Sequence, residues 1–187
     1  PQARLTEINL VDNGFQLPRD WKTNFAADIR LQNGFELTLE ATYAKVLSGL
    51  LFQSINRKDS VGNFSGADDR SYFLASGNSI KINPNFTNVF LLTNTNKGWR
   101  YNLTAGLSKK TKIYQGYVGY TFGESKDISS TVRSSHAANF EWNQAINANN
   151  PELAYSNFDL RHKIISTQFL IFGLGKKQFM TIGVVYN

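Results

Sequence analysis

Apolar and polar residues alternate along several segments of this 187-residue chain. In the clearest of them, Trp99, Tyr101 and Leu103 alternate with Arg100 and Asn102. Because successive side chains of a β-strand point to opposite faces, a period of two predicts strands with one apolar and one polar face. The strand at 162–172 alternates poorly, so its facing stays open. In all, the pattern predicts six strands, at residues 21–31, 35–52, 99–108, 113–122, 162–172 and 178–186.

The connections between these strands differ in length in a regular way. Short turns follow the first, third and fifth strands, and the first turn carries Asn33-Gly34, a pair that favours the positive backbone angles of a tight hairpin. Long polar segments follow the second and fourth strands, at 53–98, with local strand near Val89–Leu92, and at 123–160. The other two short turns lie at 109–112 and 173–177.

Tight turns at one rim and long loops at the other are typical of outer-membrane barrels, whose short turns face the periplasm. The sequence therefore predicts an all-β fold, an antiparallel transmembrane β-barrel. Six strands are too few to close a barrel, so we expect a partial one, and we interpret the start at Pro1 as that of a fragment. A soluble β-sandwich is the alternative fold, disfavoured because loops of roughly 40 residues are uncommon in compact domains.

The two faces of the predicted strands suit lipid on one side and water on the other. The apolar face carries mainly Phe, Leu, Tyr, Ile and Val, and the opposite face carries Glu, Thr, Asn, Arg and Gln. Trp99, Tyr101, Tyr120 and Phe122 lie near strand ends, where we expect an aromatic girdle at the membrane interface. No stretch approaches the ~20 apolar residues of a membrane helix, so the predicted crossing is by strands.

Composition narrows the classes of chemistry. Twenty Lys and Arg against 14 Asp and Glu give a formal charge of +6, but outside Lys109–Lys112 and Lys176–Lys177 the positive charges are scattered, so we expect no nucleic-acid partner. The absence of Cys rules out disulfides, thiolate metal sites and cysteine nucleophiles. No metal or catalytic motif surrounds the two histidines, His136 and His162, so we expect no catalytic residue, metal or cofactor.

The segment Asp159-Leu160-Arg161-His162 admits two interpretations. In a barrel enzyme, Asp159 and His162 would form a catalytic pair, which needs a nucleophile that the sequence does not place. The favoured interpretation is structural: Asp159, Arg161 and His162 form the end of a loop and pin the strand that follows.

The second long loop gathers aromatic and amide side chains. Rings and amides together stack on sugars or pack against peptides, so this segment supplies the predicted ligand contacts. The alternative, in which the loop folds back on itself and fills the mouth of the barrel, stays open. The candidate ligand contacts are Phe140, Trp142, Asn143, Gln144 and Tyr155.

Several stretches of the chain resemble one known family. They are Phe86–Leu103 (FTNVFLLTNTNKGWRYNL), Tyr120–Ser129 (YTFGESKDIS), Asn149–His162 (NNPELAYSNFDLRH) and Gly14–Leu51, which includes the hairpin NGFELTLEATYAKVL. These stretches look like the C-terminal barrel portion of TonB-dependent outer-membrane receptors, in the Oar-like branch related to the SusC-type importers.

The resemblance implies a barrel of 22 strands, a plug domain, and a short periplasmic box that engages the TonB complex. On this basis we expect a fragment of a receptor that takes up an oligopeptide, a glycan or a chelate across the outer membrane, and not an enzyme. The expected partners are membrane lipid, lipopolysaccharide and, through N-terminal parts, the TonB complex, with a surface lipoprotein as a further candidate. A surface barrel that serves adhesion or secretion-associated assembly without transport is the alternative function.

Overall fold

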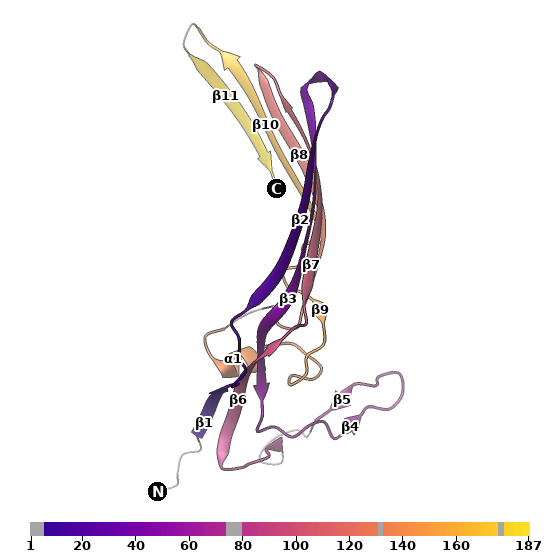
Figure 1. Ribbon diagram of the computed structural model, residues 1–187, viewed down its shortest axis with the longest axis vertical. Helices are drawn as coiled ribbons and strands as arrows, with labels where there is room; N and C mark the ends of the chain where they lie inside the picture. The colour runs from indigo at the N-terminus through magenta and orange to yellow at the C-terminus, as the bar shows by residue number, and fades with distance from the viewer. Residues whose placement is uncertain (1–5, 74–79, 131–132, 176–177) are drawn as a thin grey trace. The chain divides into compact units, whose positions relative to one another are not determined.

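The computed structural model describes residues 6–73, 80–130, 133–175 and 178–187 of the chain. This described part is mostly β, with nine strands in one mixed, open sheet and two more in a separate hairpin (Figure 1). The elements are β1 (Thr6–Val11), β2 (Arg19–Arg30), the 3-10 turn η1 (Gln32–Gly34), β3 (Phe35–Ser54), β4 (Gly62–Asn63), β5 (Ser71–Tyr72), β6 (Phe86–Thr95), β7 (Trp99–Lys110), β8 (Tyr114–Asp127), α1 (His136–Glu141), β9 (Ala154–Tyr155), β10 (His162–Gly173) and β11 (Phe179–Tyr186).

The six strands expected from the alternation are present as β2, β3, β7, β8, β10 and β11. Their ends differ from the expected ones by a few residues, most of all in β8, which runs on to Asp127. Parts of the expected connections lie outside the described residues: 176–177 of the turn at 173–177, 74–79 of the first long loop, and 131–132 of the second.

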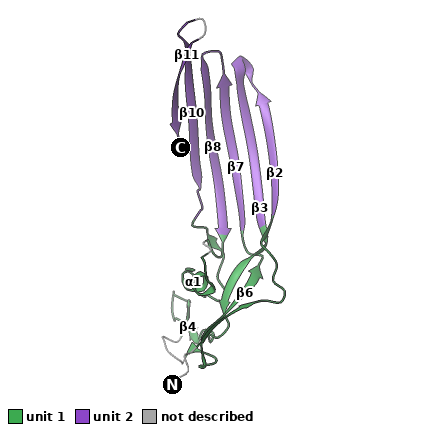
Figure 2. Cartoon of the chain, turned by 90° about the vertical axis from the view of Figure 1, so that its left-hand side faces the viewer, with its two compact units in different colours: residues 1–20, 46–98, 127–157 green, residues 21–45, 99–126, 158–187 purple. Residues whose placement is uncertain are grey.

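The chain forms two compact units (Figure 2). Unit 2 contains residues 21–45, 99–126 and 158–187, and unit 1 contains the rest of the described chain. Unit 2 is therefore built from the six expected strands, except residues 46–52 of the second one. Those residues belong to unit 1, together with the N-terminal segment and most of the two segments expected to be long loops.

In unit 2 each strand pairs with its neighbours in sequence. β2 pairs with β3, the Phe35–Lys45 part of β3 pairs antiparallel with β7, and β7–β8, β8–β10 and β10–β11 follow in the same way. Figure 2 shows these strands side by side in that order. The result is an up-and-down meander whose outer strands are β2 and β11.

The tight turns of the meander lie at one end of its strands. Asn33 and Gly34 adopt φ values of 60° and 75°, as the Asn-Gly pair predicts, and the Leu31 N–H donates to the Phe35 carbonyl at 2.8 Å. Thr111 N–H likewise donates to the carbonyl of Tyr114, at 2.7 Å. The two long connections, from β3 to β7 and from β8 to β10, leave from the opposite ends of these strands.

The register places like residues in rows across the meander. One row joins Leu39, Ala105, Tyr120 and Ile164 through direct pairs, and the next residues on the same strands, Glu40, Thr104, Thr121 and Lys163, form a row on the other face. Thr104 and Thr121 share a hydrogen bond of 2.9 Å on that polar face. The register also settles the facing of β10, which the sequence left open: Ile164 and Leu170 lie on the apolar face with Ser166 and Gln168, whereas Ile165 and Phe169 lie on the polar face.

The apolar face of the meander is its more exposed face. Leu103, Val118 and Ile164 are 50%, 48% and 51% exposed, whereas Gly119 and Ile165 on the polar face are buried and half-buried. A soluble sheet buries its apolar face and exposes its polar one, so unit 2 has the reverse arrangement.

The position of the Tyr117 side chain explains why two residues on the polar face are glycines. A Cβ atom built on Gly106 would lie 2.7 Å from the Tyr117 hydroxyl, and one built on Gly119 would lie closer still, so the ring lies directly over both glycine backbones. Gly106 and Gly119 are themselves register partners on β7 and β8. We infer that the absence of side chains at these positions makes room for the ring to cover two paired strands.

Unit 1 corrects the expectation of two loops with little structure. β6 is a full strand, longer than the local strand expected near residues 89–92, and it pairs antiparallel with the Gly49–Ser54 part of β3. It also pairs with β1, which the sequence did not predict. Only Val89–Leu92 at the centre of β6 form an unbroken apolar run, and these residues are buried or half-buried on both faces, so this part of the strand shows no alternation.

The purely antiparallel arrangement that we expected is wrong for one pair. β1 runs parallel to β6, with Leu10 opposite Leu91 and Val11 opposite Leu92, so the sheet is mixed. A parallel pair needs a crossover connection and leaves no hairpin signal in the sequence, which explains why the pattern of turns did not reveal it.

A short helix, α1, also lies in unit 1 and was not expected from the pattern. Ser135 caps it by accepting a hydrogen bond from Ala138 N–H at 3.2 Å, and Phe140 packs against Phe90 with ring centroids 5.7 Å apart. At six residues, α1 is too short for a helical periodicity to be recognised. Among the described helices, none has the length and apolarity needed to cross a membrane.

Candidate functional site

Four of the five predicted ligand contacts line one hollow in unit 1. Trp142, Asn143, Gln144 and Tyr155 meet there, although Tyr155 lies on β9 and the others follow α1. The hollow measures about 500 Å³, within the range of small-molecule sites, and its lining is mainly polar. Their role in ligand contact remains a prediction. The rest of the lining is Asp127, Ile128, Ser129, Ser130, Arg133, Glu152, Ala154 and Asn157.

Hydrogen bonds hold the walls of this hollow in place. The Ser130 hydroxyl donates to Asp127 at 2.9 Å and accepts from Asn157 N–H at 2.8 Å, which joins both sides of the hollow. Asn143 donates to the Ile128 carbonyl at 2.9 Å. Ser130, Asp127 and Asn143 are thus oriented by contacts within the protein, as a preformed site requires.

Two aromatic rings give the hollow its apolar surface. Trp142 and Tyr155 are 67% and 57% exposed, and the Arg133 guanidinium lies 5.5 Å from the centre of the Trp142 ring. Exposed rings beside carboxylates, amides and a guanidinium combine stacking with directional hydrogen bonding. This arrangement can hold a small polar molecule that has an apolar face.

Phe140, the fifth predicted ligand contact, lies elsewhere. It is 6% exposed and packs against Phe90 between α1 and β6. Its ring belongs to the core of unit 1, because the helix turns it inward while Trp142, two residues later, faces outward.

Asn149 ties the second connection to β3. Its side-chain amide accepts from Ser54 N–H at 2.7 Å and donates to the Ser54 carbonyl at 3.0 Å, while its own carbonyl accepts from Gln53 at 2.8 Å. Asn149 therefore makes the two hydrogen bonds to Ser54 that the backbone of a neighbouring strand would make. Lys97 fixes the next residues by donating to Asn150 and to the Pro151 carbonyl.

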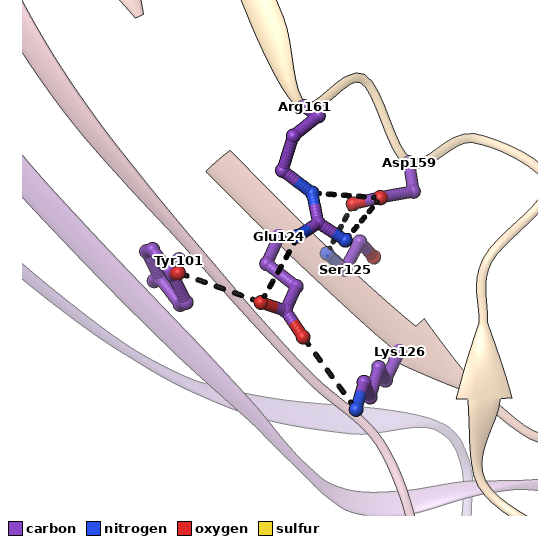
Figure 3. Close-up of polar contacts among 6 residues, drawn as sticks. All are labelled: Tyr101, Glu124, Ser125, Lys126, Asp159 and Arg161. Atoms are coloured by element: carbon purple, nitrogen blue, oxygen red, sulfur yellow. Dashed lines mark hydrogen bonds and ion pairs between the residues drawn. The ribbon is translucent and has the colours of Figure 1, made fainter. Parts of the chain in front are cut away.

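Asp159 and Arg161 link the start of β10 to the end of β8, within unit 2 (Figure 3). The Asp159 carboxylate accepts from Ser125 N–H at 2.6 Å and pairs with Arg161 at 3.1 Å. Arg161 also reaches Glu124 at 3.5 Å, and its carbonyl accepts from Gly123 N–H at 3.0 Å. These contacts complete the pairing of β8 and β10 beyond the last register pair.

His162 lies beside this cluster and has a different partner. Its Nδ1 shares a hydrogen bond of 2.7 Å with the Tyr120 hydroxyl, and its ring lies 5.4 Å from that of Phe122. Asp159 and His162 thus bind separate partners, and their role as a pinned loop end stays a prediction. No group of three or more metal-ligating side chains occurs within the described ranges.

The contacts of Asp159 at the junction of β8 and β10 lower the pKa of its carboxyl. Burial raises the pKa of the Asp159 carboxyl, but the Ser125 N–H and the Arg161 guanidinium outweigh burial and hold that pKa below its ordinary value. A lowered carboxyl pKa stabilises the folded state fully above the unfolded pKa of about 3.9, and this contribution is lost as the pH falls through the folded value.

We therefore expect the Ser125 amide to lose protection from hydrogen exchange as the pH falls from 5 to below 4, after correction for the intrinsic rate. Asp159→Asn keeps an acceptor for Ser125 N–H but removes the ionisation, so its corrected protection should change little over the same range. Equal pH profiles for the two proteins would show that Asp159 does not control this junction.

Several residues of the site escaped the sequence analysis. Ser130, Arg133 and Glu152 carry no local motif, and they line one hollow only because 127–130 and Arg133 lie close to 152–157. Asn149 had a partial signal, since the run Asn147 to Pro151 is typical of turns. Its partner, Ser54, lies 95 residues away, a pairing that no local pattern indicates.

The chain was compared with known families, proteins and structures. No family model, no curated protein and no solved structure matches the chain.

Proposed function

We propose that this chain is a part of the wall and the external loops of an outer-membrane TonB-dependent receptor that takes up a nutrient. The observation that carries the proposal is the meander of unit 2, whose apolar face is more exposed than its polar face. Lipid is the solvent that makes such a face stable, and a polar lumen suits the other face.

The dimensions of the apolar face support this proposal. Aromatic residues lie at both ends of it: Tyr43 and Tyr101 toward the long connections, and Phe35 and Tyr114 toward the tight turns. Tyr43 and Phe35 are eight residues apart on β3, or about 27 Å at ~3.4 Å per residue along a strand. That span, reduced by the tilt of the strands, is close to the apolar band of ~25 Å in transmembrane barrels.

The exposed edges of the meander also favour a larger barrel. Every residue of β11 is exposed, and so is every residue of β2 except Ala27. Unpaired backbone at a sheet edge is not tolerated in lipid, so a membrane wall of this kind needs further strands at both sides. We propose that other parts of the receptor supply them and that the hollow around Trp142 contributes to nutrient capture.

The test is to find the native protein by a peptide of this chain, such as Thr23–Arg30, after fractionation and detergent extraction. We expect a carbonate-resistant outer-membrane protein several times heavier than 21.1 kDa, whose mobility on gels changes with heating. A soluble protein near 21 kDa would contradict the proposal. An outer-membrane protein that does not bind the periplasmic domain of TonB would favour the adhesion alternative.

A further inference from the structure

The apolar face of unit 2 carries a hollow of about 380 Å³. The small side chains of Ala41 and Ala105 leave room at its floor, because Ala41 lies opposite Leu103 and Ala105 lies opposite Leu39 in the register of β3 and β7. Phe25 of β2 lines the hollow as well, as do Tyr120 and Phe122 of β8. The hollow is open and predominantly apolar, which suits a hydrocarbon and not a polar nutrient.

Two rows of side chains lie beyond the hollow toward the long connections. The first row is Tyr43, Tyr101 and Glu124, and the second is Lys45, Trp99 and Lys126, each joined by direct register pairs. Lys126 Nζ lies 5.7 Å from the centre of the Trp99 ring, with Glu124 3.5 Å away. Lys45 on the other side of Trp99 is exposed.

The charges around these rows favour an anionic group. Three positive side chains (Lys45, Lys126 and Arg161) and two negative ones (Glu124 and Asp159) lie here, so the net charge of the group is +1. Lysines beside aromatic rings at the edge of an apolar band match the headgroup level of a membrane, where phosphates lie. A second copy of the chain would bring the same positive rows together, so it is a poorer match.

We propose that the hollow holds one acyl chain of a phosphate-bearing membrane lipid, with the phosphate beside Lys45 and Lys126. This inference rests on the proposed function, since it requires the apolar face to lie in a membrane. Ala41 and Lys45 are four residues apart on β3, or about 13 Å along the strand. The linkage between phosphate and acyl chain, together with the flexible lysine side chain, spans that distance.

The test is native mass spectrometry of the full receptor, extracted from outer membranes in mild detergent and supplied with palmitoyl-oleoyl phosphatidylglycerol. We expect the wild-type protein to retain this lipid. Ala41→Leu combined with Ala105→Leu fills the hollow and should weaken retention about tenfold, the change that follows when about two methylene groups lose their burial. Val118→Leu, which enlarges a side chain on the same face outside the hollow, should leave retention unchanged.

A second pair of substitutions tests the phosphate contact without altering the hollow. Lys45→Gln combined with Lys126→Gln should weaken retention of phosphatidylglycerol but not of diacylglycerol with the same chains. Equal retention by all variants would overturn the proposal, and so would a dimer that the leucine substitutions dissociate. If the wild-type protein is not in the membrane fraction at all, the proposed function fails first, and the fractionation result separates that outcome from a failure of the lipid site.

Discussion

Ile164→Arg is expected to cost the membrane-inserted protein about 2–4 kcal/mol, the penalty of an arginine on the lipid face near the middle of a transmembrane barrel. Ile164 lies in the central row of the apolar face, opposite Tyr120, and half of it is exposed. In lipid this exposure means contact with hydrocarbon, where a guanidinium has no water to solvate it. The measurement is the amount of heat-modifiable receptor in the outer membrane, together with its stability to urea in lipid vesicles.

Ile165→Arg is the matched control. It makes the same substitution at the next residue of β10, which lies on the polar face opposite Gly119. An arginine there would share the face with Lys163 and with the lumen water of the proposed barrel, so the cost should be clearly smaller. If unit 2 instead folds in water, the order reverses: Ile164→Arg stays within about 0.5 kcal/mol of wild type, as surface substitutions do, and the half-buried Ile165 becomes the damaging position.

Asn149→Ala is expected to release the second connection from β3 at a cost of about 1–3 kcal/mol, because Ser54 is 5% exposed and its N–H loses the acceptor that Asn149 provides. Asn150→Ala is the control, since Asn150 is exposed and its side chain accepts a hydrogen bond from the exposed Lys97 ammonium. We expect a change within about 0.5 kcal/mol. Local opening free energies from hydrogen exchange of a peptide around Ser54 measure both effects. Similar protection in the two variants would mean that Asn149 does not hold this connection.

The sheet of unit 2 was predictable because its information is local. Alternation fixes which residues of β7 and β8 share a face, and Asn33-Gly34 fixes a turn whose backbone angles few other residues adopt. Unit 1 was not predictable in this way. Val89–Leu92 in β6 are buried or half-buried on both faces, which removes the alternation there. β1 pairs with β6 from 80 residues earlier in the chain, without a hairpin connection.

The candidate site likewise has features that the sequence predicted and features that depend on distant contacts. Ring and amide composition drew attention to Trp142, Asn143, Gln144 and Tyr155, and folding brings all four to one hollow. Phe140 has the same composition signal but a different environment, since a single turn of helix directs it into the core. Asp159 and Arg161 were recognised as a polar loop end, yet their partners on β8 depend on the antiparallel register with β10.

By itself, the sequence determined where unit 2 has strands and where its tight turns lie. For most of these strands it also determined which residues share a face. All three features depend on residues within a few positions of one another. Only the tertiary structure decided how β10 faces, that the long connections contain a strand paired in parallel, and which side chains meet in the hollows. Those features depend on contacts between segments tens of residues apart, whose register is set by packing and hydrogen bonding and leaves no periodic trace in the chain.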